Sequence, residues 1–228
     1  KYYYNLVQYN KALDERNSLL KKWNPSLEDV IEVYDEQLSV YGGYVIKARL
    51  NYIDKLNKKG RIIHKEITSQ SEDIEFKYIT NVKDLANIEQ ELKALLAKNL
   101  KSDVERRTTS YGPHRDDFYI GINDIDTRSF GSQGQQRTSV LTIKFASLEI
   151  IKDETGEYPV LLLDDVLSEL DLKRQQYILN SINNVQTIIT CTGIENIKKY
   201  LSDNSKVFTV EGGRITNKYN LYDLNRLD

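Results

Sequence analysis

The chain has 228 residues, enough for one large domain or two smaller ones with a substantial core. Its 32 lysines and arginines against 34 aspartates and glutamates give a net charge of −2, which excludes a globally basic nucleic-acid binder. One cysteine, Cys191, excludes an internal disulfide, and no run of about 18 apolar residues predicts a membrane span. We therefore expect a soluble, cytoplasmic protein with no membrane partner. Because the chain lacks methionine and starts at Lys1, we also expect it to be a piece of a longer protein.

Helical spacing dominates the first sixty residues. Apolar positions three and four apart predict one helix that ends before Trp23-Asn24-Pro25, and Ser26 is expected to cap a second helix. This second helix is predicted to run for about thirty residues with one seam packed against a partner. Gly42-Gly43 in its middle predicts a kink or hinge. The seam consists of Leu27, Ile31, Tyr34, Leu38, Tyr41, Val45, Ala48, Tyr52 and Leu56.

After Gly60 the pattern alternates as in strands. Arg61–Thr68 and Asp73–Thr80 predict a hairpin joined by a polar turn. A further helix is expected to carry its apolar face from Val82 to Leu95.

The sequence pattern changes near Thr108. From there, predicted short apolar strands alternate with predicted helices, as in α/β proteins with a parallel sheet. We predict two domains: residues 1–107 as a helical arm with a hairpin at 61–80, and residues 108–228 as an α/β domain.

Two adjacent carboxylates, Asp164 and Asp165, follow the apolar run Val160–Leu163. We expect this run to be a strand buried on both faces, and α/β proteins place ligands at the carboxyl ends of such strands. In nucleotide hydrolases one carboxylate here helps to hold Mg²⁺ and its neighbour orients the attacking water. The alternative is a pair of solvated aspartates that cap the next helix.

A glycine-rich turn, Gly131–Arg137, precedes a predicted helix with apolar residues from Val140 to Ile151. Such a turn presents free backbone N–H groups and the positive end of the helix dipole, which together bind anions. Ser132 and Gln135 add side-chain hydrogen bonds. The alternative is an ordinary flexible loop with a helix cap.

Three further elements follow the carboxylates. Ser168-Glu169-Leu170-Asp171 precedes a predicted helix from Leu172 to Ile182, which it would cap. Thr187–Thr190 predicts a strand that continues into Cys191 and Thr192. Val207–Val210 and Arg214–Thr216 predict a terminal hairpin around Gly212-Gly213.

In this order, the glycine-rich turn, the strand with two carboxylates, the S-E-L-D segment and the next strand resemble the signature loop, Walker B strand, D-loop and switch strand of an ATP-binding-cassette (ABC) ATPase head. Longer segments resemble the RecF family of SMC-like ATPases, which act in bacterial recombination. The resemblance covers nearly the whole chain and implies the C-terminal half of an ABC-type head, with a mostly parallel sheet, beside an α-helical arm containing a small β-hairpin. The segments are Tyr111–Asp117, Phe130–Thr138, Leu161–Asp171, Leu13–Lys21 and Trp23-Asn24.

The resemblance implies a protein of DNA replication and repair that forms an ATP-dependent homodimer. It would bind double-stranded DNA at gaps and junctions and assist recombinase loading with RecR and RecO. Ser132, Gly134 and Gln135 would touch the γ-phosphate of ATP held by the partner subunit, and Asp171 would lie across the dimer contact.

The resemblance also assigns the metal and water positions. Asp164 would support Mg²⁺ and Asp165 would orient the hydrolytic water, with a shorter side chain than the Glu of many transporters. Cys191 or Thr192 stands where the broader class often has His. None of the eleven glycines precedes a lysine, so the phosphate-binding Walker A loop is absent from this chain, and we expect no ATP hydrolysis by it alone.

DNA contact is expected at local basic patches. Seven cations against Asp54 give a net +6 between residues 47 and 65, and phosphate binding there would be independent of sequence and sensitive to salt. The alternative is a solvated helix end balanced by acidic residues between Glu28 and Glu36. The seven are Lys47, Arg49, Lys55, Lys58, Lys59, Arg61 and Lys65. A second candidate patch consists of Lys98, Lys101, Arg106, Arg107 and Arg115.

Two questions stay open at the level of sequence. Gly112-Pro113-His114-Arg115 forms either a structural bend into a strand at Phe118–Ile122 or a turn whose Arg115 reaches nucleotide or the dimer partner. With one other histidine, His64, no zinc site is expected. A competing function is a non-catalytic module whose helical arm recruits a partner protein.

Overall fold

The computed structural model describes residues 1–167, 170–182, 185–193, 198, 201 and 205–220. The chain divides into two compact units. The first comprises Lys1–Lys58 and Ile74–Gly131, and the second comprises Lys59–Asp73 and the residues from Ser132 onward. The predicted boundary at residue 107 differs from this division, because the strand that follows residue 107 pairs with a strand of the first unit. No described helix combines the length and apolar character needed to cross a membrane.

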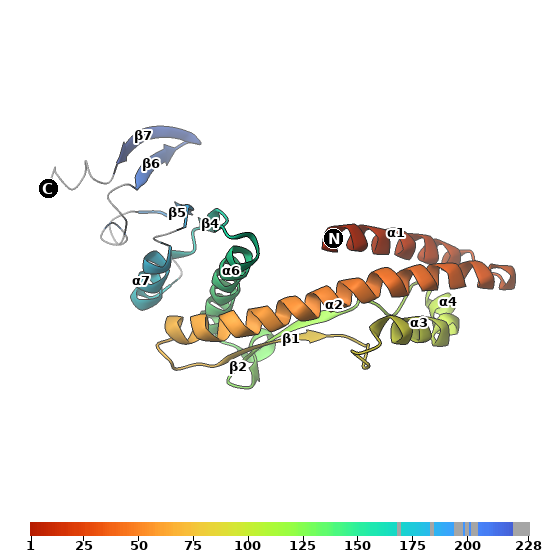
Figure 1. Ribbon diagram of the computed structural model, residues 1–228. Helices are drawn as coiled ribbons and strands as arrows, with labels where there is room; N and C mark the ends of the chain where they lie inside the picture. The colour runs from red at the N-terminus through yellow and green to blue at the C-terminus, as the bar shows by residue number, and fades with distance from the viewer. Residues whose placement is uncertain (168–169, 183–184, 194–197, 199–200, 202–204, 221–228) are drawn as a thin grey trace. The chain divides into compact units, whose positions relative to one another are not determined.

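Four α-helices and one turn of 3₁₀ helix form most of the first unit (Figure 1). The helices are α1 (Tyr2–Lys21), α2 (Glu28–Ile67, of which the part up to Lys58 belongs here), α3 (Ile88–Lys98) and α4 (Leu100–Arg106), and the 3₁₀ turn is Pro25–Leu27. The predicted end of the first helix is confirmed. The prediction that Ser26 caps the second helix is wrong: Asn24 Oδ1 accepts the Ser26 N–H and caps the 3₁₀ turn instead.

Helix α2 has 40 residues, which corresponds to about 60 Å, and it extends through the predicted strand Arg61–Thr68 as far as Ile67. The hairpin predicted at 61–80 is therefore wrong. Leu56, Ile63 and Ile67 are buried at helical spacing, and this packing outweighs the strand preference of the β-branched residues. Only the second half of the predicted hairpin is a strand, β1 (Ile74–Ile79).

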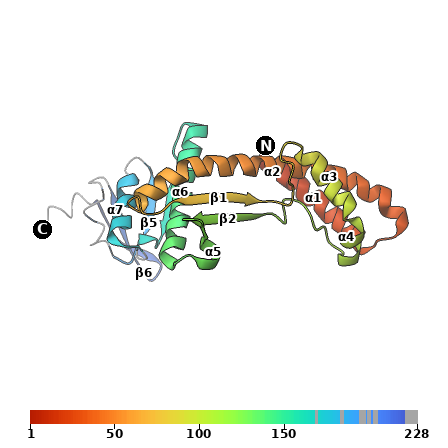
Figure 2. The ribbon, with the colours of Figure 1, turned by 90° about the horizontal axis from the view of Figure 1, so that it is seen from below.

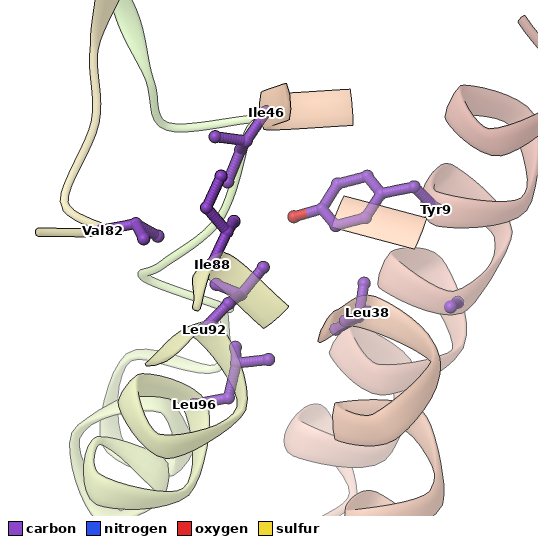
Figure 3. Packing of buried hydrophobic residues seen from close by; sticks show 8 residues of the cluster. Tyr9, Leu38, Ile46, Val82, Ile88, Leu92 and Leu96 are labelled. Atoms are coloured by element: carbon purple, nitrogen blue, oxygen red, sulfur yellow. The ribbon is translucent and has the colours of Figure 1, made fainter. Parts of the chain in front are cut away.

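Gly42 and Gly43 lie within continuous helix and not at a break between two helices. A Cβ at Gly42 would come 2.9 Å from Leu92 Cδ2 and 3.0 Å from Tyr9 Cε2. The missing side chain thus permits close packing of α2 against α1 and α3. Figure 3 shows this core from close by, with Tyr9, Leu38, Ile46, Val82, Ile88, Leu92 and Leu96 labelled.

A three-stranded antiparallel sheet completes the first unit. Its order is β1, β2 (Asp117–Ile122), β3 (Ile125–Asp126), with Ile74 opposite Ile122 and Tyr78 opposite Phe118. Figure 2 shows β1 and β2 side by side. The small hairpin of this unit is β2–β3, and the short helix α5 (Thr127–Phe130) follows it. The helix predicted from Val82 begins only at Ile88, so Val82 and Leu85 precede it.

The second unit contains the predicted alternation of helices and strands. A parallel pair, β4 (Leu161–Asp164) and β5 (Thr187–Thr190), runs in register from Leu161 opposite Thr187 to Asp164 opposite Thr190. The prediction that this strand is buried on both faces is wrong for this chain, since Leu161 and Leu163 are buried but Leu162 is 61% exposed. The other elements are α6 (Gln133–Thr155), α7 (Leu172–Ser181) and the hairpin β6 (Lys206–Glu211) to β7 (Arg214–Asn220), which confirms the predicted terminal hairpin.

Candidate nucleotide and metal site

Residues 131–135, here called the signature turn, lead into the 23-residue helix α6 through a complete capping box. Ser132 Oγ accepts the Gln135 N–H at 3.2 Å, and Gln135 Oε1 accepts the Ser132 N–H at 3.0 Å. This arrangement fixes the first turn of the helix at its positive dipole end. The geometry suits an anion, since the N–H groups early in a helix have no partner within it.

Asp171 caps a second helix close to this turn. Its Oδ1 accepts the Arg174 N–H at 3.0 Å, and its Oδ2 pairs with Arg174 Nη1 at 2.5 Å. The hydrogen bond from the Arg174 N–H lowers the pKa of Asp171. Arg174 Nη1 lies 3.9 Å from where a Cβ on Gly134 would stand, so the side chain that pairs with Asp171 lies beside the signature turn. Ser168 and Glu169, the first residues of the S-E-L-D segment, lie outside the described residues.

Asp164 and Asp165 stand at the carboxyl end of β4, and both side chains are exposed. The Thr190 hydroxyl donates to Asp164 Oδ1 at 2.5 Å and accepts the Asp165 N–H at 2.9 Å. Asp165 has a φ of 49°, the left-handed region that few non-glycine residues adopt. The strand end is thereby turned so that two consecutive carboxylates remain exposed, where a metal ion or a water molecule can reach them.

Thr190 is a site residue that the sequence reasoning missed. Cys191 and Thr192, predicted for the switch position, follow the end of β5 and are exposed. The register of the parallel pair places Thr190 opposite Asp164, and this pairing is a property of the folded sheet that the sequence of neither strand shows.

A cavity of about 370 Å³ adjoins the two carboxylates. Arg137 and Lys144 on α6 contribute positive charge to its wall. Ser132, Gly134 and Gln135 are not among its described lining residues, whereas Gln136 and Arg137, which follow them, are. The lining residues are Gln136, Arg137, Val140, Leu141, Lys144, Asp164, Asp165, Val166 and Leu170.

The carboxylates fit Mg²⁺ only together with a second source of oxygen ligands. Within the described residues, no group of three or more His, Cys, Asp or Glu side chains is arranged to hold a metal ion. Mg²⁺ in nucleotide sites is commonly held by one or two carboxylates, waters and the phosphates of the substrate. Asp164, whose carboxylate is hydrogen-bonded to Thr190, would provide one carboxylate of such a site. The phosphates of the nucleotide would provide the further oxygen ligands.

The first basic patch is largely occupied by partners within the chain. Lys58 pairs with Asp54 at 2.7 Å, and in the second unit Lys59 pairs with Asp153 at 2.7 Å and Lys65 with Asp73 at 2.8 Å. Arg49 donates to the Pro113 carbonyl at 2.7 Å and to the Tyr78 hydroxyl at 3.3 Å. Arg61 and Lys55 also interact within the chain, and Lys47 is exposed. These pairs are not with the acidic residues between Glu28 and Glu36.

The second basic patch is more open. Lys98 ends α3, Lys101 and Arg106 lie on α4, and Arg107 caps α4 with a φ of 55°. All four are exposed, and none forms an ion pair with the described part of the chain. The fifth member, Arg115, instead donates from Nε to the Thr109 carbonyl at 3.2 Å.

The turn at Gly112–Arg115 has a structural role within the first unit. His114 Nδ1 lies 2.6 Å from the Tyr9 hydroxyl, and its Nε2 lies 3.1 Å from the Thr109 carbonyl. Burial lowers the pKa of His114. Gly112 has a φ of 127°, and a Cβ there would come 2.3 Å from the Tyr9 hydroxyl, so this position requires glycine. These contacts match the predicted structural bend.

A scan against models of protein families gives no match. The chain is 64% identical over 215 residues to the DNA replication and repair protein RecF of Clostridium novyi (strain NT), and 63% identical to that of Clostridium perfringens (strain SM101 / Type A). Each match covers 94% of this chain and 59% of the relative, so the chain spans about three fifths of the length of these proteins.

Two solved structures share its fold. Both are structures of the recombination mediator protein RecF in the RecFOR pathway, one described with ATP and one with ATPrS. They superpose with TM-scores of 0.82 and 0.80 at 41% identity. The match covers 96% and 94% of this chain and 58% of each neighbour. The resemblance to RecF and the ABC-type fold are confirmed over this span.

Proposed function

We propose that this chain, which has the sequence and fold of RecF proteins over almost its whole length, supplies the signature turn and the hydrolytic carboxylates of an ATP-driven DNA-binding dimer. Such a protein acts in DNA replication and recombinational repair, as the names of its relatives indicate. The observation that carries the proposal is the presence of two features in one chain, a capped helix N-terminus and an exposed carboxylate pair, of which only the carboxylate pair is among the described lining of the cavity.

Two copies bring these two features together. Ser132, Gly134 and Gln135 of one copy contact the γ-phosphate of ATP carried by the other copy, where the dipole of α6 attracts negative charge. Asp171 lies across the dimer contact, held by Arg174. The two copies are therefore expected to form a dimer only when ATP is bound, because its γ-phosphate links them.

In the copy that carries the nucleotide, Asp164 would hold Mg²⁺, and the ion would supply positive charge to the phosphates. Asp165 orients the attacking water, and Thr190 fixes both residues through its hydroxyl. Thr192 lies beyond this hydrogen-bonded group and serves at most as a phosphate sensor at the strand end. Since no glycine here precedes a lysine, the phosphate-binding loop comes from polypeptide outside these 228 residues.

Asp165→Asn in a full-length RecF protein carrying this segment tests the catalytic part. We expect ATP hydrolysis to slow by about 100-fold or more and the ATP-bound dimer to live longer, because the amide no longer accepts a proton from water. ATPase rates and light scattering with ATP measure the two effects. Asp153→Asn, on the far part of α6, is the matched control.

Unchanged hydrolysis and dimer lifetime in Asp165→Asn would remove the catalytic assignment and favour the non-catalytic module instead. As a further check, the 228-residue chain alone is expected to show no ATP turnover, and appreciable turnover by the pure chain would contradict the need for an outside phosphate-binding loop.

We propose DNA binding through basic residues of the helical unit, in concert with RecR and RecO as partners. The open cations Lys98, Lys101, Arg106 and Arg107 support the second patch over the first, whose cations are mostly paired. Reversing two charges at Lys101 and Arg106 is expected to reduce the salt dependence of binding to gapped duplex by about two counterions. Charge reversal at Lys58 and Lys59 is the matched comparison. A larger decrease in the salt dependence of DNA binding in that variant would place the DNA interface at the first patch.

A further inference from the structure

The signature turn depends on a side-chain amide whose two ends are both engaged. Gln135 Oε1 accepts the Ser132 N–H at 3.0 Å, and Gln135 Nε2 donates to Glu72 Oε1 at 3.0 Å. A carboxylate can only accept hydrogen bonds, so Glu72 requires the NH₂ end of the amide to face it. The oxygen must then face Ser132. Without Glu72 only the Ser132 N–H selects the oxygen end, so the amide loses one of the two hydrogen bonds that orient it.

The other oxygen of Glu72 faces a buried histidine. Glu72 Oε2 lies 3.4 Å from His64 Nε2, and the His64 ring is fully buried while the Glu72 side chain is 17% exposed. Neither of these two atoms forms a hydrogen bond with the described residues, so the histidine confines the carboxylate by packing. Glu72 follows two consecutive residues with positive φ, Ser69 at 53° and Gln70 at 66°, which turn the chain back toward α6.

His64 is fixed by α6 further along the same helix. Its Nδ1 lies 2.9 Å from the Thr142 hydroxyl, which in turn donates to the Thr138 carbonyl at 2.9 Å. The single hydroxyl proton is thus used, so the Thr142 oxygen accepts the hydrogen bond from the Nδ1–H group of His64. In the neutral ring Nε2 then carries no hydrogen, and it faces Glu72 Oε2 without a hydrogen bond. Glu72 therefore lies between Gln135, to which it is hydrogen-bonded, and the buried His64 ring, which it only contacts.

We propose that Glu72 is a positioning residue for the signature turn: with His64 behind it, it holds the Gln135 amide so that the capping box stays closed and the N-terminus of α6 is ready for phosphate. The role in phosphate binding rests on the proposed function, whereas the role in holding the turn does not.

Hydrogen exchange in the 228-residue chain tests the positioning role without nucleotide. Glu72→Ala is expected to speed exchange of the Ser132 N–H about tenfold, the size of one lost hydrogen-bond contribution, and to shift the side-chain amide resonances of Gln135. Glu72→Gln retains an acceptor for Gln135 and offers its NH₂ group to His64 Nε2, so exchange returns to within about twofold of the parent chain.

Glu66→Ala is the matched control. Like His64, Glu66 lies near the end of α2, but its carboxylate accepts a hydrogen bond from the Tyr177 hydroxyl of α7 at 2.8 Å. Glu66→Ala is therefore expected to leave the exchange rate of the Ser132 N–H unchanged. The proposal is overturned if Glu72→Ala leaves Ser132 exchange at the parent rate, or if Glu66→Ala speeds it equally, since the effect would then be general loosening.

A second measurement separates this inference from the proposed function. In a full-length RecF protein with these residues, Glu72→Ala is expected to weaken ATP-induced dimerisation about tenfold and Glu72→Gln to restore it, with Ser132→Arg as the reference that abolishes it. If Ser132→Arg has no effect on dimerisation while Glu72→Ala still speeds exchange, the proposed function fails and the positioning role stands. If Ser132→Arg abolishes dimerisation while Glu72→Ala changes neither exchange nor dimerisation, the positioning role is overturned.

Discussion

The two units use the same charged residue types in opposite ways. In the first unit Arg16 has no solvent exposure, and it donates from Nε to Asp35 at 2.5 Å and from Nη1 to Asp103 at 2.7 Å. In the second unit Asp164 and Asp165 are exposed at the end of a strand. Buried charges must satisfy one another, while exposed carboxylates on a fixed backbone remain available to a ligand.

This difference shows how burial, and not residue type, separates structural from chemical roles. Thr109 carries no charge but belongs to the buried network, because its hydroxyl oxygen accepts a hydrogen bond from Arg16 Nη1 at 3.0 Å. Burial raises the pKa of Asp35 even though Arg16 lies beside it, which shows how strongly this site disfavours an unpaired charge. We expect substitutions in the first network to change stability and substitutions at the β4 end to change chemistry.

The largest expected effect comes from breaking the buried network. Arg16→Met retains much of the side-chain volume but leaves Asp35 and Asp103 without their cation, which is expected to cost about 3–5 kcal/mol of unfolding free energy. Urea unfolding followed by fluorescence of Trp23, the single tryptophan and a residue of this unit, measures it.

Lys93→Met is the control, because its ion pair with Glu36 is exposed and is expected to contribute nothing measurable. If both variants unfolded at the same urea concentration as the parent chain, the buried network would have no special role in stability, and the contrast between the units would disappear.

A smaller effect is expected at the paired glycines of α2. Gly42→Ala places a methyl group 2.9 Å from Leu92 Cδ2, and overpacking of this kind costs about 1–3 kcal/mol against a gain in helix propensity of about 1 kcal/mol. Gly43→Ala meets Glu89 Cβ at 3.4 Å, an ordinary contact, so it is expected to stabilise the chain by about 0.5–1 kcal/mol.

Thermal unfolding of the two glycine variants provides the comparison. Equal stabilisation by both would mean that Gly42 is not needed for close packing, and a hinge at this point would again become the better explanation.

The last prediction concerns pH, with one histidine in each unit. Burial lowers the pKa of His64, against the attraction of Glu72, and burial lowers the pKa of His114. The unfolded chain therefore takes up these protons first, and stability is lost as pH falls below about 6.5, by at most about 1.4 kcal/mol per pH unit for each histidine.

Melting temperatures at pH 7.5, 6.5 and 5.5 measure the slope, and the single variants His64→Gln and His114→Gln each remove one contribution. Arg174 and Asp73 face His64 in addition to Glu72, and Arg115, Asp103 and Arg16 act on His114, so these charges are left unchanged. A parent chain that melts at a higher temperature at pH 5.5 than at pH 7.5 would contradict the sign.

Local pattern was sufficient for much of the fold. The apolar run Val160–Leu163 followed by aspartates predicted β4, and the turn Gly131–Arg137 predicted the start of α6, because both signals come from neighbouring residues. The misassigned strand at 61–68 illustrates the limit. Gly60 and the β-branched residues after it indicated that the helix ends there. However, Leu56, Ile63 and Ile67 continue the helical spacing, and their burial stabilises the helix through this segment.

Sequence alone determined the segment order, the two carboxylates, the glycine-rich turn and the resemblance to RecF, because each is a contiguous pattern set by local backbone chemistry. Tertiary structure alone decided the contacts that cross long distances along the chain: Thr190 with Asp164, Arg16 with Asp103, and Glu72 with Gln135. These partners lie 26, 87 and 63 positions apart, and only strand register, helix packing and burial bring their atoms within hydrogen-bonding range.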